Sequence, residues 1–179
     1  MTHAAKELQE VSPEVLYSDG GFLAVDQDMV RLLKEKARLS PRRRCRLCFH
    51  ASSDDLQQEM LIVMHRSSYV RPHRHLRRAE TLAIIEGHCE TLLFDPDGHV
   101  TEILRMSPAA EGGIFFYKMP PGIFHTLIFK SDWLVFLETT IGPFDPSSSE
   151  AAPWAPPETD AAAGDAYLSR LMFGGIEIR

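Results

Sequence analysis

The stretch AETLAIIEGHCETLLFDPDGHVTEILRM, at residues 79–106, decides the class of fold. It contains three short segments rich in β-branched and aromatic residues, at 79–86, 88–95 and 99–106. The sequence DPDG at 95–98 presets a tight reversal, because proline and glycine favour the backbone angles of a turn. Segments of this length joined by such a turn predict antiparallel strands that pair as hairpins.

Segments of the same kind continue on both sides of this stretch. They lie at 45–50, 56–65, 114–119, 125–130 and 133–141. Two more turn sequences separate the last three of them, PPG at 120–122 and SD at 131–132. Eight short strands with turns of this kind predict a mainly β, single-domain barrel or jelly roll.

A helix is predicted before the first strand, at residues 26–39. Its apolar residues follow one another at three- and four-residue steps, as on one helix face. They are Met29, Val30, Leu33 and Ala37. Asp26 or Asp28 can cap the start, and Ser40-Pro41 ends the helix, because the residue before a proline is pushed out of the helical region. We expect an N-terminal extension with this helix at 1–41, and the barrel at 42–142.

Residues 143–179 are expected to form a tail that packs on the barrel. Proline, serine, alanine and acidic residues dominate as far as Gly164, so this part cannot build a core of its own. Trp154 is its expected anchor. A short helix is predicted over 165–172, with one apolar face. That face would consist of Ala166, Leu168, Leu171 and Met172.

Composition and charge limit the classes of function. The 179 residues are 44% hydrophobic and carry a formal charge of −6, which argues against a surface devoted to nucleic acid. No run approaches the roughly 18 apolar residues of a membrane span, and the N-terminus lacks a cationic start followed by an apolar run. Three cysteines without an export signal predict reduced thiols. These features predict a cytoplasmic protein with a small-molecule ligand, and neither nucleic acid nor a membrane as partner.

The residues that carry chemistry gather in SSYVRPHRHLRRAETLAIIEG, at 67–87. His73 and His75 are two residues apart, so on an extended backbone they face the same side, roughly 6.6 Å apart. Glu80 follows at the start of the next strand, and the turn at 120–122 can direct His125 back toward the first pair. Three imidazoles and a carboxylate predict a site for one divalent transition metal ion, Fe, Mn, Ni, Cu or Zn. Positions left open on that ion could bind water or a substrate.

Arginine residues cluster near this motif. Arg71 and Arg74 flank the histidine pair, and guanidinium groups bind carboxylates and phosphates. Tyr69 and His50 are further candidates, since ligand pockets combine aromatic walls with a few polar groups. We therefore predict Arg71, Arg74, Tyr69 and His50 as substrate-binding residues. The CxxC motif at 45–48 is interpreted as two structural thiols, because the chain has no second CxxC to complete a zinc site.

The order and spacing of these residues resemble the cupin superfamily, whose motifs read G-x5-HxH-x4-E-x6-G and G-x5-PxG-x2-H-x3-N. The matching residues are His73, His75, Glu80 and Gly87 in the first motif, and Pro120, Gly122 and His125 in the second. The motifs have Gly, Gly and Asn where this chain has Ser67, Ile114 and Phe129, none of which is a ligand. The resemblance implies a double-stranded β-helix that holds one metal ion through His73, His75, Glu80 and His125.

The resemblance narrows to the WbuC-type cupins and covers most of the chain. It is carried by runs such as SYVRPHRH at 68–75, FDPDG at 94–98 and GPFDP at 142–146. Arg46 and Cys48 stand where members of that family tend to have asparagine. The resemblance implies a metalloprotein often encoded beside O-antigen biosynthesis genes, and barrels of this kind often form homodimers.

Three functions fit the predicted site. The first is a metal-dependent enzyme, a dioxygenase or a sugar isomerase or epimerase, acting on a small polar or anionic substrate. The resemblance, not any residue of the site, implies that this substrate is derived from a sugar. The second is a non-catalytic module that binds or senses a small ligand through its metal, since no general base is evident beyond the ligands. The third is metal-free epimerisation by a His–Asp dyad, as in some sugar epimerases of similar fold, which the ligand spacing of Glu80 and two histidines disfavours. The sequence assigns no catalytic residue and does not identify the metal.

Overall fold

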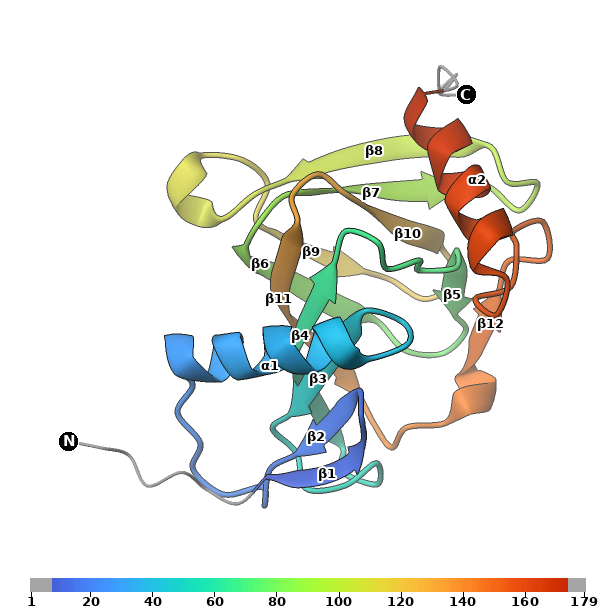
Figure 1. Ribbon diagram of the computed structural model, residues 1–179. Coiled ribbons are helices and arrows are strands. Elements are labelled where there is room, and N and C mark those ends of the chain that lie inside the picture. The colour runs from blue at the N-terminus through green and yellow to red at the C-terminus, as the bar shows by residue number, and fades with distance from the viewer. Residues whose placement is uncertain (1–7, 174–179) are drawn as a thin grey trace.

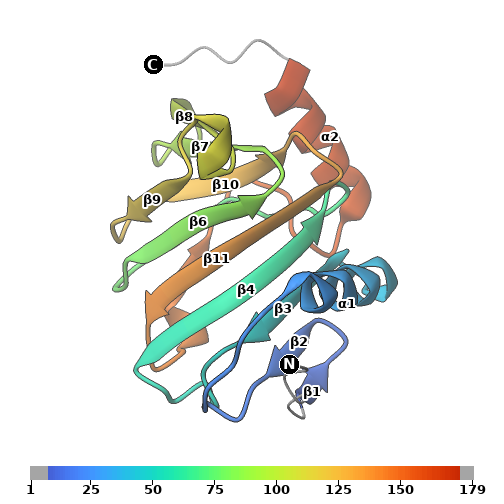
Figure 2. The ribbon, with the colours of Figure 1, turned by 90° about the vertical axis from the view of Figure 1, so that its left-hand side faces the viewer.

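Two β-sheets face each other and enclose the core (Figure 1, Figure 2). The computed structural model describes residues 8–173. Within these residues the larger sheet has seven strands, in the order β1 (Gln9–Ser12), β2 (Val15–Tyr17), β3 (Arg44–Cys48), β4 (Gln57–His65), β11 (Trp133–Ile141), β6 (Glu80–Glu86) and β9 (Phe116–Met119). The smaller sheet of the same region has five, in the order β12 (Ser149–Ala151), β5 (His73–His75), β10 (Phe124–Phe129), β7 (Cys89–Phe94) and β8 (Val100–Met106). The mainly β, single-domain jelly-roll fold of a cupin is confirmed.

The eight predicted strands are present, with ends shifted by one or two residues. The sequence reasoning missed β1, β2, β5 and β12, which are three or four residues long. Strands this short show no alternation of their own, and they are defined by the backbone pairing with neighbouring strands. One consequence is that the N-terminal extension joins the larger sheet, where β2 runs parallel to β3.

Inward side chains of both sheets build the main core. Leu134 and Phe136 on β11 and Leu82 on β6 are almost fully buried there. Because side chains alternate along a strand, the next inward positions on β11 and β6 are Glu138 and Glu80. The interior between the sheets is therefore partly polar, and this is where the candidate site lies.

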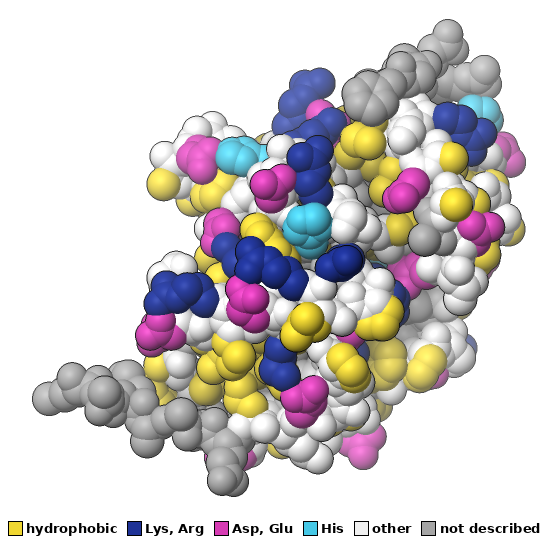
Figure 3. Space-filling model, viewed as in Figure 1, with side chains coloured by type: hydrophobic (Ala, Val, Ile, Leu, Met, Phe, Trp, Pro, Cys, Tyr) yellow, Lys and Arg dark blue, Asp and Glu magenta, His cyan; other side chains and the backbone are white. Residues whose placement is uncertain are grey.

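Helix α1 (Gln27–Leu39) covers the outer face of β3 and β4 (Figure 2). The Asp26 side chain accepts hydrogen bonds from the backbone N–H groups of Asp28 and Met29, at 3.0 and 3.1 Å, so it is the N-cap. Val30, Leu33 and Ala37 are buried against the sheet, which confirms the predicted helix and its apolar face. The outer face of α1 carries basic and acidic side chains side by side (Figure 3).

The tail lies on the outer face of the smaller sheet (Figure 1). Trp154 packs against Phe94 and Phe124, with ring centroids 5.0 and 5.9 Å away, and its indole N–H donates to the carbonyl of Pro96 at 3.2 Å. The expected anchor therefore contacts the barrel. Two 3-10 turns occur in the described region, at Ala109–Glu111 and Pro146–Ser148.

The C-terminal helix α2 (Ala161–Phe173) begins earlier than predicted, and its buried face differs. Tyr167 and Leu168 are buried in the cluster around Trp154, whereas Ala166 is exposed and Met172 is 39% exposed. The predicted face was wrong at Ala166 and Met172, because the contact between Tyr167 and Trp154 sets the rotation of the helix. No helix within residues 8–173 is long and apolar enough to cross a bilayer.

Candidate metal centre

Three histidine rings from two neighbouring strands meet inside the barrel. His73 and His75 lie on β5, and His125 on β10 is the direct antiparallel partner of His73. One ring nitrogen from each lies within 4.8 Å of the other two. The ring centroids of His73 and His125 are 4.7 Å apart, and those of His73 and His75 are 5.2 Å apart. The i, i+2 spacing and the pairing of β5 with β10 together produce this cluster.

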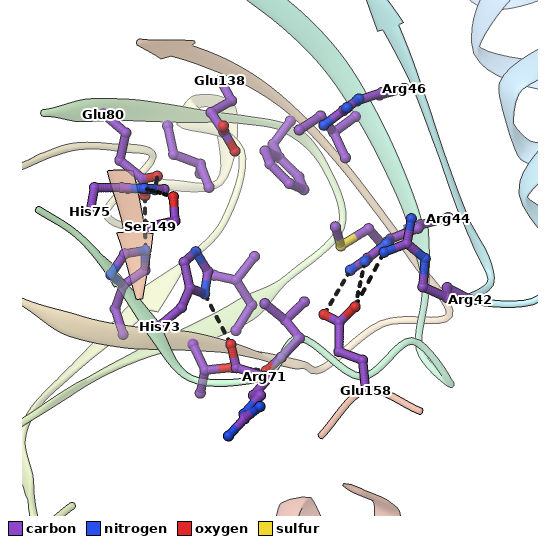
Figure 4. A pocket seen from close by; sticks show the side chains of 18 of the residues that line it. Arg42, Arg44, Arg46, Arg71, His73, His75, Glu80, Glu138, Ser149 and Glu158 are labelled. Atoms are coloured by element: carbon purple, nitrogen blue, oxygen red, sulfur yellow. Dashed lines mark hydrogen bonds and ion pairs between the residues drawn. The ribbon is translucent and has the colours of Figure 1, made fainter. Parts of the chain in front are cut away.

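Glu80 reaches the histidines from the facing sheet, at the start of β6 (Figure 4). Its Oε2 lies 2.8 Å from Nε2 of His75, and its Oε1 lies 3.2 Å from Nε2 of His125. The hydroxyl of Tyr117 donates to Oε1 at 3.0 Å. Glu80 is 4% exposed, so its charge must be balanced within the barrel.

Outer hydrogen bonds fix which nitrogen of each ring faces the centre. Nδ1 of His73 and Nδ1 of His125 donate to the backbone carbonyls of Arg71 and Ile123, at 2.9 and 3.0 Å. A carbonyl can only accept, so both rings carry their proton on Nδ1 and direct Nε2 inward. Nδ1 of His75 is 2.9 Å from Oγ of Ser149, which can accept in the same way. Such outer-shell acceptors orient the histidine ligands of metal ions in proteins.

The electrostatics of the cluster favour a cation at its centre. Burial, reinforced by the neighbouring His125, lowers the pKa of His73 to about 4, so this ring is neutral near pH 7. Burial would raise the pKa of Glu80, but hydrogen bonds and charges from His125 and His75 hold it well below its usual range. Burial would lower the pKa of His125, whereas Glu80 raises it above its usual value. An ionised carboxylate that faces two Nε2 atoms needs a proton on those nitrogens or a metal cation between the groups.

The donor set fits a divalent metal ion. In the neutral state the inward Nε2 atoms present lone pairs, and a lone pair cannot face a carboxylate oxygen without a proton or a cation between them. Three imidazole nitrogens and one carboxylate are ligands that Fe, Mn, Ni and Zn ions accept. His73 and His125 thus have the tautomer that metal binding requires, and His75 and Glu80 lie beside them. A histidine triad that could hold a metal is therefore present in the described part of the chain.

A cavity of about 730 Å³ opens beside this cluster, between the two sheets. Its apolar wall includes Ile62, Met64, Leu82 and Phe136. Its polar wall includes Arg42, Arg44, Arg46, Arg71, Arg78, Glu138 and Glu158. A cavity of this size is typical of sites for small molecules, and one side of it ends at the histidines (Figure 4).

Of the predicted substrate-binding residues, the structure places only Arg71 among the described residues that line the cavity. Arg74 lies between His73 and His75 on β5, so the pleat turns it to the opposite face. There its guanidinium binds Glu150 at 2.7 and 3.0 Å and lies over the ring of Phe124. The prediction that Arg74 faces the substrate is therefore not supported by its position.

Tyr69 and His50 also lie away from the main cavity. Tyr69 is buried in the cluster under α2, and its hydroxyl donates to the carbonyl of Pro156 at 3.0 Å. His50 lines a smaller neighbouring pocket of about 60 Å³, and its Nδ1 accepts from the backbone N–H of Glu59 at 3.1 Å. Both side chains are occupied by structural contacts that their aromatic or polar character alone did not reveal.

Three residues of the site were missed by the sequence reasoning: Tyr117, Ser149 and Glu138. Glu138 had a visible signal, because it continues the inward series Leu134, Phe136 along β11 and so places an acid where an apolar residue is expected. Tyr117 alternates with Met119 on β9 and had no such signal. Ser149 belongs to β12, a strand that the composition of the tail does not predict.

Comparisons with known proteins bear on the fold. A family model described as "Domain of unknown function (DUF6016)" matches residues 25–106, a range that contains His73, His75 and Glu80 but not His125. No curated protein matches the chain. Among solved structures, the capsular polysaccharide assembling protein CapF from Staphylococcus aureus is similar with a TM-score of 0.50 and 16% identity, over 63% of this chain and 32% of that chain.

Two other structures are similar at lower scores. Protein SO0799 from Shewanella oneidensis has a TM-score of 0.45 and 14% identity, over 55% of this chain and 63% of that one. Oxalate decarboxylase from Bacillus subtilis has a TM-score of 0.45 and 16% identity, over 70% of this chain and 32% of that one. The chain thus spans at most 63% of the length of these three proteins. The similarity to CapF concerns the fold alone.

Proposed function

We propose that this chain is a metal-dependent cupin enzyme that acts on a small polar or anionic substrate. The observation that carries the proposal is the cluster of three Nε2 atoms and the Glu80 carboxylate at the wall of a cavity. His73, His75, Glu80 and His125 would hold one divalent ion of Fe, Zn, Mn or Ni. Such an ion supplies Lewis-acid chemistry to a substrate oxygen. Four protein ligands leave room for that oxygen if the ion is octahedral.

The residues of the chain around this centre have separate tasks. The carbonyls of Arg71 and Ile123 and the hydroxyl of Ser149 hold the rings in place. Tyr117 orients Glu80 through its hydrogen bond. Glu138 lines the cavity without belonging to the cluster, and burial and the charge of Glu80 raise its pKa to about 8. A carboxyl of this kind can hold a proton near pH 7 and exchange it with a bound substrate.

The subfamily, substrate, reaction type, compartment and oligomeric state that the sequence leads us to expect belong to the same proposal. We place the chain with the WbuC-type cupins, on its motifs, and propose a sugar-derived substrate and a reaction of the oxygenase or isomerase type. The three cysteines of the chain are free and buried, which suits a reducing compartment such as the cytoplasm. A homodimer is proposed as the working unit.

Elemental analysis of the purified, untagged protein tests the metal centre. We expect bound transition metal in the wild type, its loss in His73→Ala and in His125→Ala, and weaker retention in Glu80→Gln. His88→Ala is the matched control, because His88 is exposed and pairs with Glu111 on the surface. Unchanged metal content in both His73→Ala and His125→Ala would show that the site is wrongly assigned.

Turnover assays on the loaded protein then test catalysis. Oxygen uptake by the Fe-loaded protein with catechols, thiols and diketones would indicate an oxygenase, and interconversion of aldoses and ketoses would indicate an isomerase. Stabilisation by sugar phosphates, nucleotide sugars or dicarboxylates without any product would instead favour a binding or sensing module. A protein that never retains metal, even after metal is added, would exclude the proposal.

A further inference from the structure

Several buried guanidinium nitrogens, which belong to arginines that line the cavity, lack hydrogen-bond partners. Among residues 8–173, these buried atoms are Nε of Arg46, Nε of Arg71, and Nε and Nη1 of Arg78. All three arginines line the cavity. A buried, charged donor without a partner is costly, so proteins satisfy such groups with protein atoms, water or a ligand. An oxygen acceptor that reaches these nitrogens would satisfy them.

Arg46 and Arg78 belong to the same part of the cavity, although they come from β3 and from the loop between β5 and β6. Both also line the smaller pocket beside it, together with Glu138 and Phe144. Arg78 is held in place, because its guanidinium lies 5.3 Å from the centroid of the Phe144 ring and its Nη2 donates to Oγ of Ser149 at 3.3 Å. A fixed guanidinium with free N–H groups loses little entropy when it binds an oxyanion.

The charges in this part of the cavity are not balanced. Arg42 is neutralised by an ion pair with Glu14, and both Arg42 and Arg44 form ion pairs with Glu158 (Figure 4). Among the residues that line the smaller pocket, Arg46 and Arg78 have one acidic neighbour, Glu138, and no hydrogen bond joins their unpartnered nitrogens to it in the described region. Two cationic groups against one acidic group leave a net positive charge.

The pKa shift of Arg78 agrees with this imbalance. Burial lowers the pKa of Arg78, and the carboxylates of Glu138, Glu80 and Asp145 do not fully offset that effect. A bound anion would supply the missing negative charge.

This subsite is adjacent to the metal centre. Oγ of Ser149 contacts both Nη2 of Arg78, at 3.3 Å, and Nδ1 of His75, at 2.9 Å. The Ser149 hydroxyl therefore bridges Arg78 and His75. A small molecule bound at the arginines would lie beside the histidine cluster.

We propose that Arg46 and Arg78 bind the oxyanion group of the substrate, a carboxylate or a phosphate, while another oxygen of the same molecule points to the metal centre. The inference names the substrate class of the proposed function and rests on it. Both ligand chemistries offer oxygen acceptors that match guanidinium donors. A neutral sugar would leave the positive charge unbalanced and is expected to bind more weakly.

The test compares two probe anions, inorganic phosphate and succinate, by calorimetric titration of the full-length chain in metal-free and metal-loaded form. We expect at least one of them to bind the wild type. Arg46→Gln and Arg78→Gln should each weaken that binding by about 10- to 100-fold, the usual effect of losing one charged hydrogen bond. Arg105→Gln is the matched control, because Arg105 lies on β8 with its side chain 83% exposed. Thermal unfolding should show that all three variants are folded, and Arg46→Gln and Arg105→Gln should keep the metal content of the wild type.

Each outcome decides something about the subsite. Binding of phosphate alone indicates a phosphate-bearing substrate, and binding of succinate alone indicates a carboxylate-bearing one. If one arginine variant fails to fold, the other and Arg78→Lys, which keeps the charge, still test the idea. The inference is overturned if neither anion binds the wild type in either metal state, or if both glutamine variants bind as the wild type does. His73→Ala separates it from the proposed function, because that variant should lose metal and keep anion binding.

Discussion

The hydroxyl of Ser149 offers a sharp test of how the tail supports the metal centre. Oγ of Ser149 lies 2.9 Å from Nδ1 of His75, a ring that is only 9% exposed. In Ser149→Ala this nitrogen loses its partner, and little water can replace it. The net value of one such hydrogen bond is about 0.5–1.5 kcal/mol, and outer-shell partners of metal ligands typically contribute about 10- to 100-fold in affinity. We expect metal affinity to fall by about tenfold.

Competition against a chromogenic chelator measures this change with Zn(II) or Mn(II). Ser149→Thr keeps the hydroxyl and should restore most of the affinity. Ser147→Ala is the control from the same segment, because Ser147 is exposed and its hydroxyl donates to Asp145, away from the histidines. The backbone pairing of β12 with β5 does not involve the side chain, so the stability of the fold should change little. Equal metal affinity in Ser149→Ala and wild type would refute the reasoning that the tail orients His75.

Three further predictions concern stability. Burial alone would raise the pKa of Glu158, but the neighbouring Arg44 lowers it by more, so the net shift is downward. Glu158→Gln should therefore lower the free energy of unfolding by about 1 kcal/mol near pH 7, and this loss should fade as the pH falls below the ordinary carboxyl pKa of 4.5. A loss that persists in urea unfolding at lower pH would contradict the prediction. Trp154→Ala should lower the free energy of unfolding by about 2 kcal/mol, roughly half the value for a fully buried ring, and the melting temperature by about 4–8 °C. An unchanged melting temperature would show that Trp154 does not anchor the tail. Gly87 has φ of 84°, and a Cβ there would lie 2.0 Å from the carbonyl oxygen of Trp133. Gly87→Ala should therefore lower the free energy of unfolding by at least about 2 kcal/mol, as measured by thermal unfolding. A Gly87→Ala protein as stable as the wild type would disprove the close approach.

The barrel could be predicted largely from local patterns. Strands such as β4 and β11 are nine residues long and strongly apolar, so composition and turns locate them without tertiary information. Strands β5 and β12 are three residues long and exist because they pair with each other and with β10. The prediction of the apolar face of α2 was wrong for a related reason. The ring of Trp154, which lies outside that helix in the sequence, decides which side of the helix is buried.

The candidate metal site could be predicted from the sequence because the spacing of its residues is informative. His73 and His75 share a strand face by their spacing alone, and the turn before His125 directs that residue back toward them. The proposed substrate-binding residues were harder to predict from the sequence. Arg74 is adjacent in sequence to both histidines and still faces the opposite side, whereas Arg78 enters the cavity from an irregular loop whose course no periodicity describes.

By itself, the amino-acid sequence determined the β architecture, the capped helix before it and the four residues of the candidate metal cluster, because turn chemistry and side-chain alternation act within a few residues. Only the tertiary structure decided that Arg46, Arg78 and Glu138 face one cavity and that Ser149 contacts His75. Alternation states which side of a strand a residue faces, but not which distant residue lies opposite. That partner depends on how the two sheets and the tail pack together.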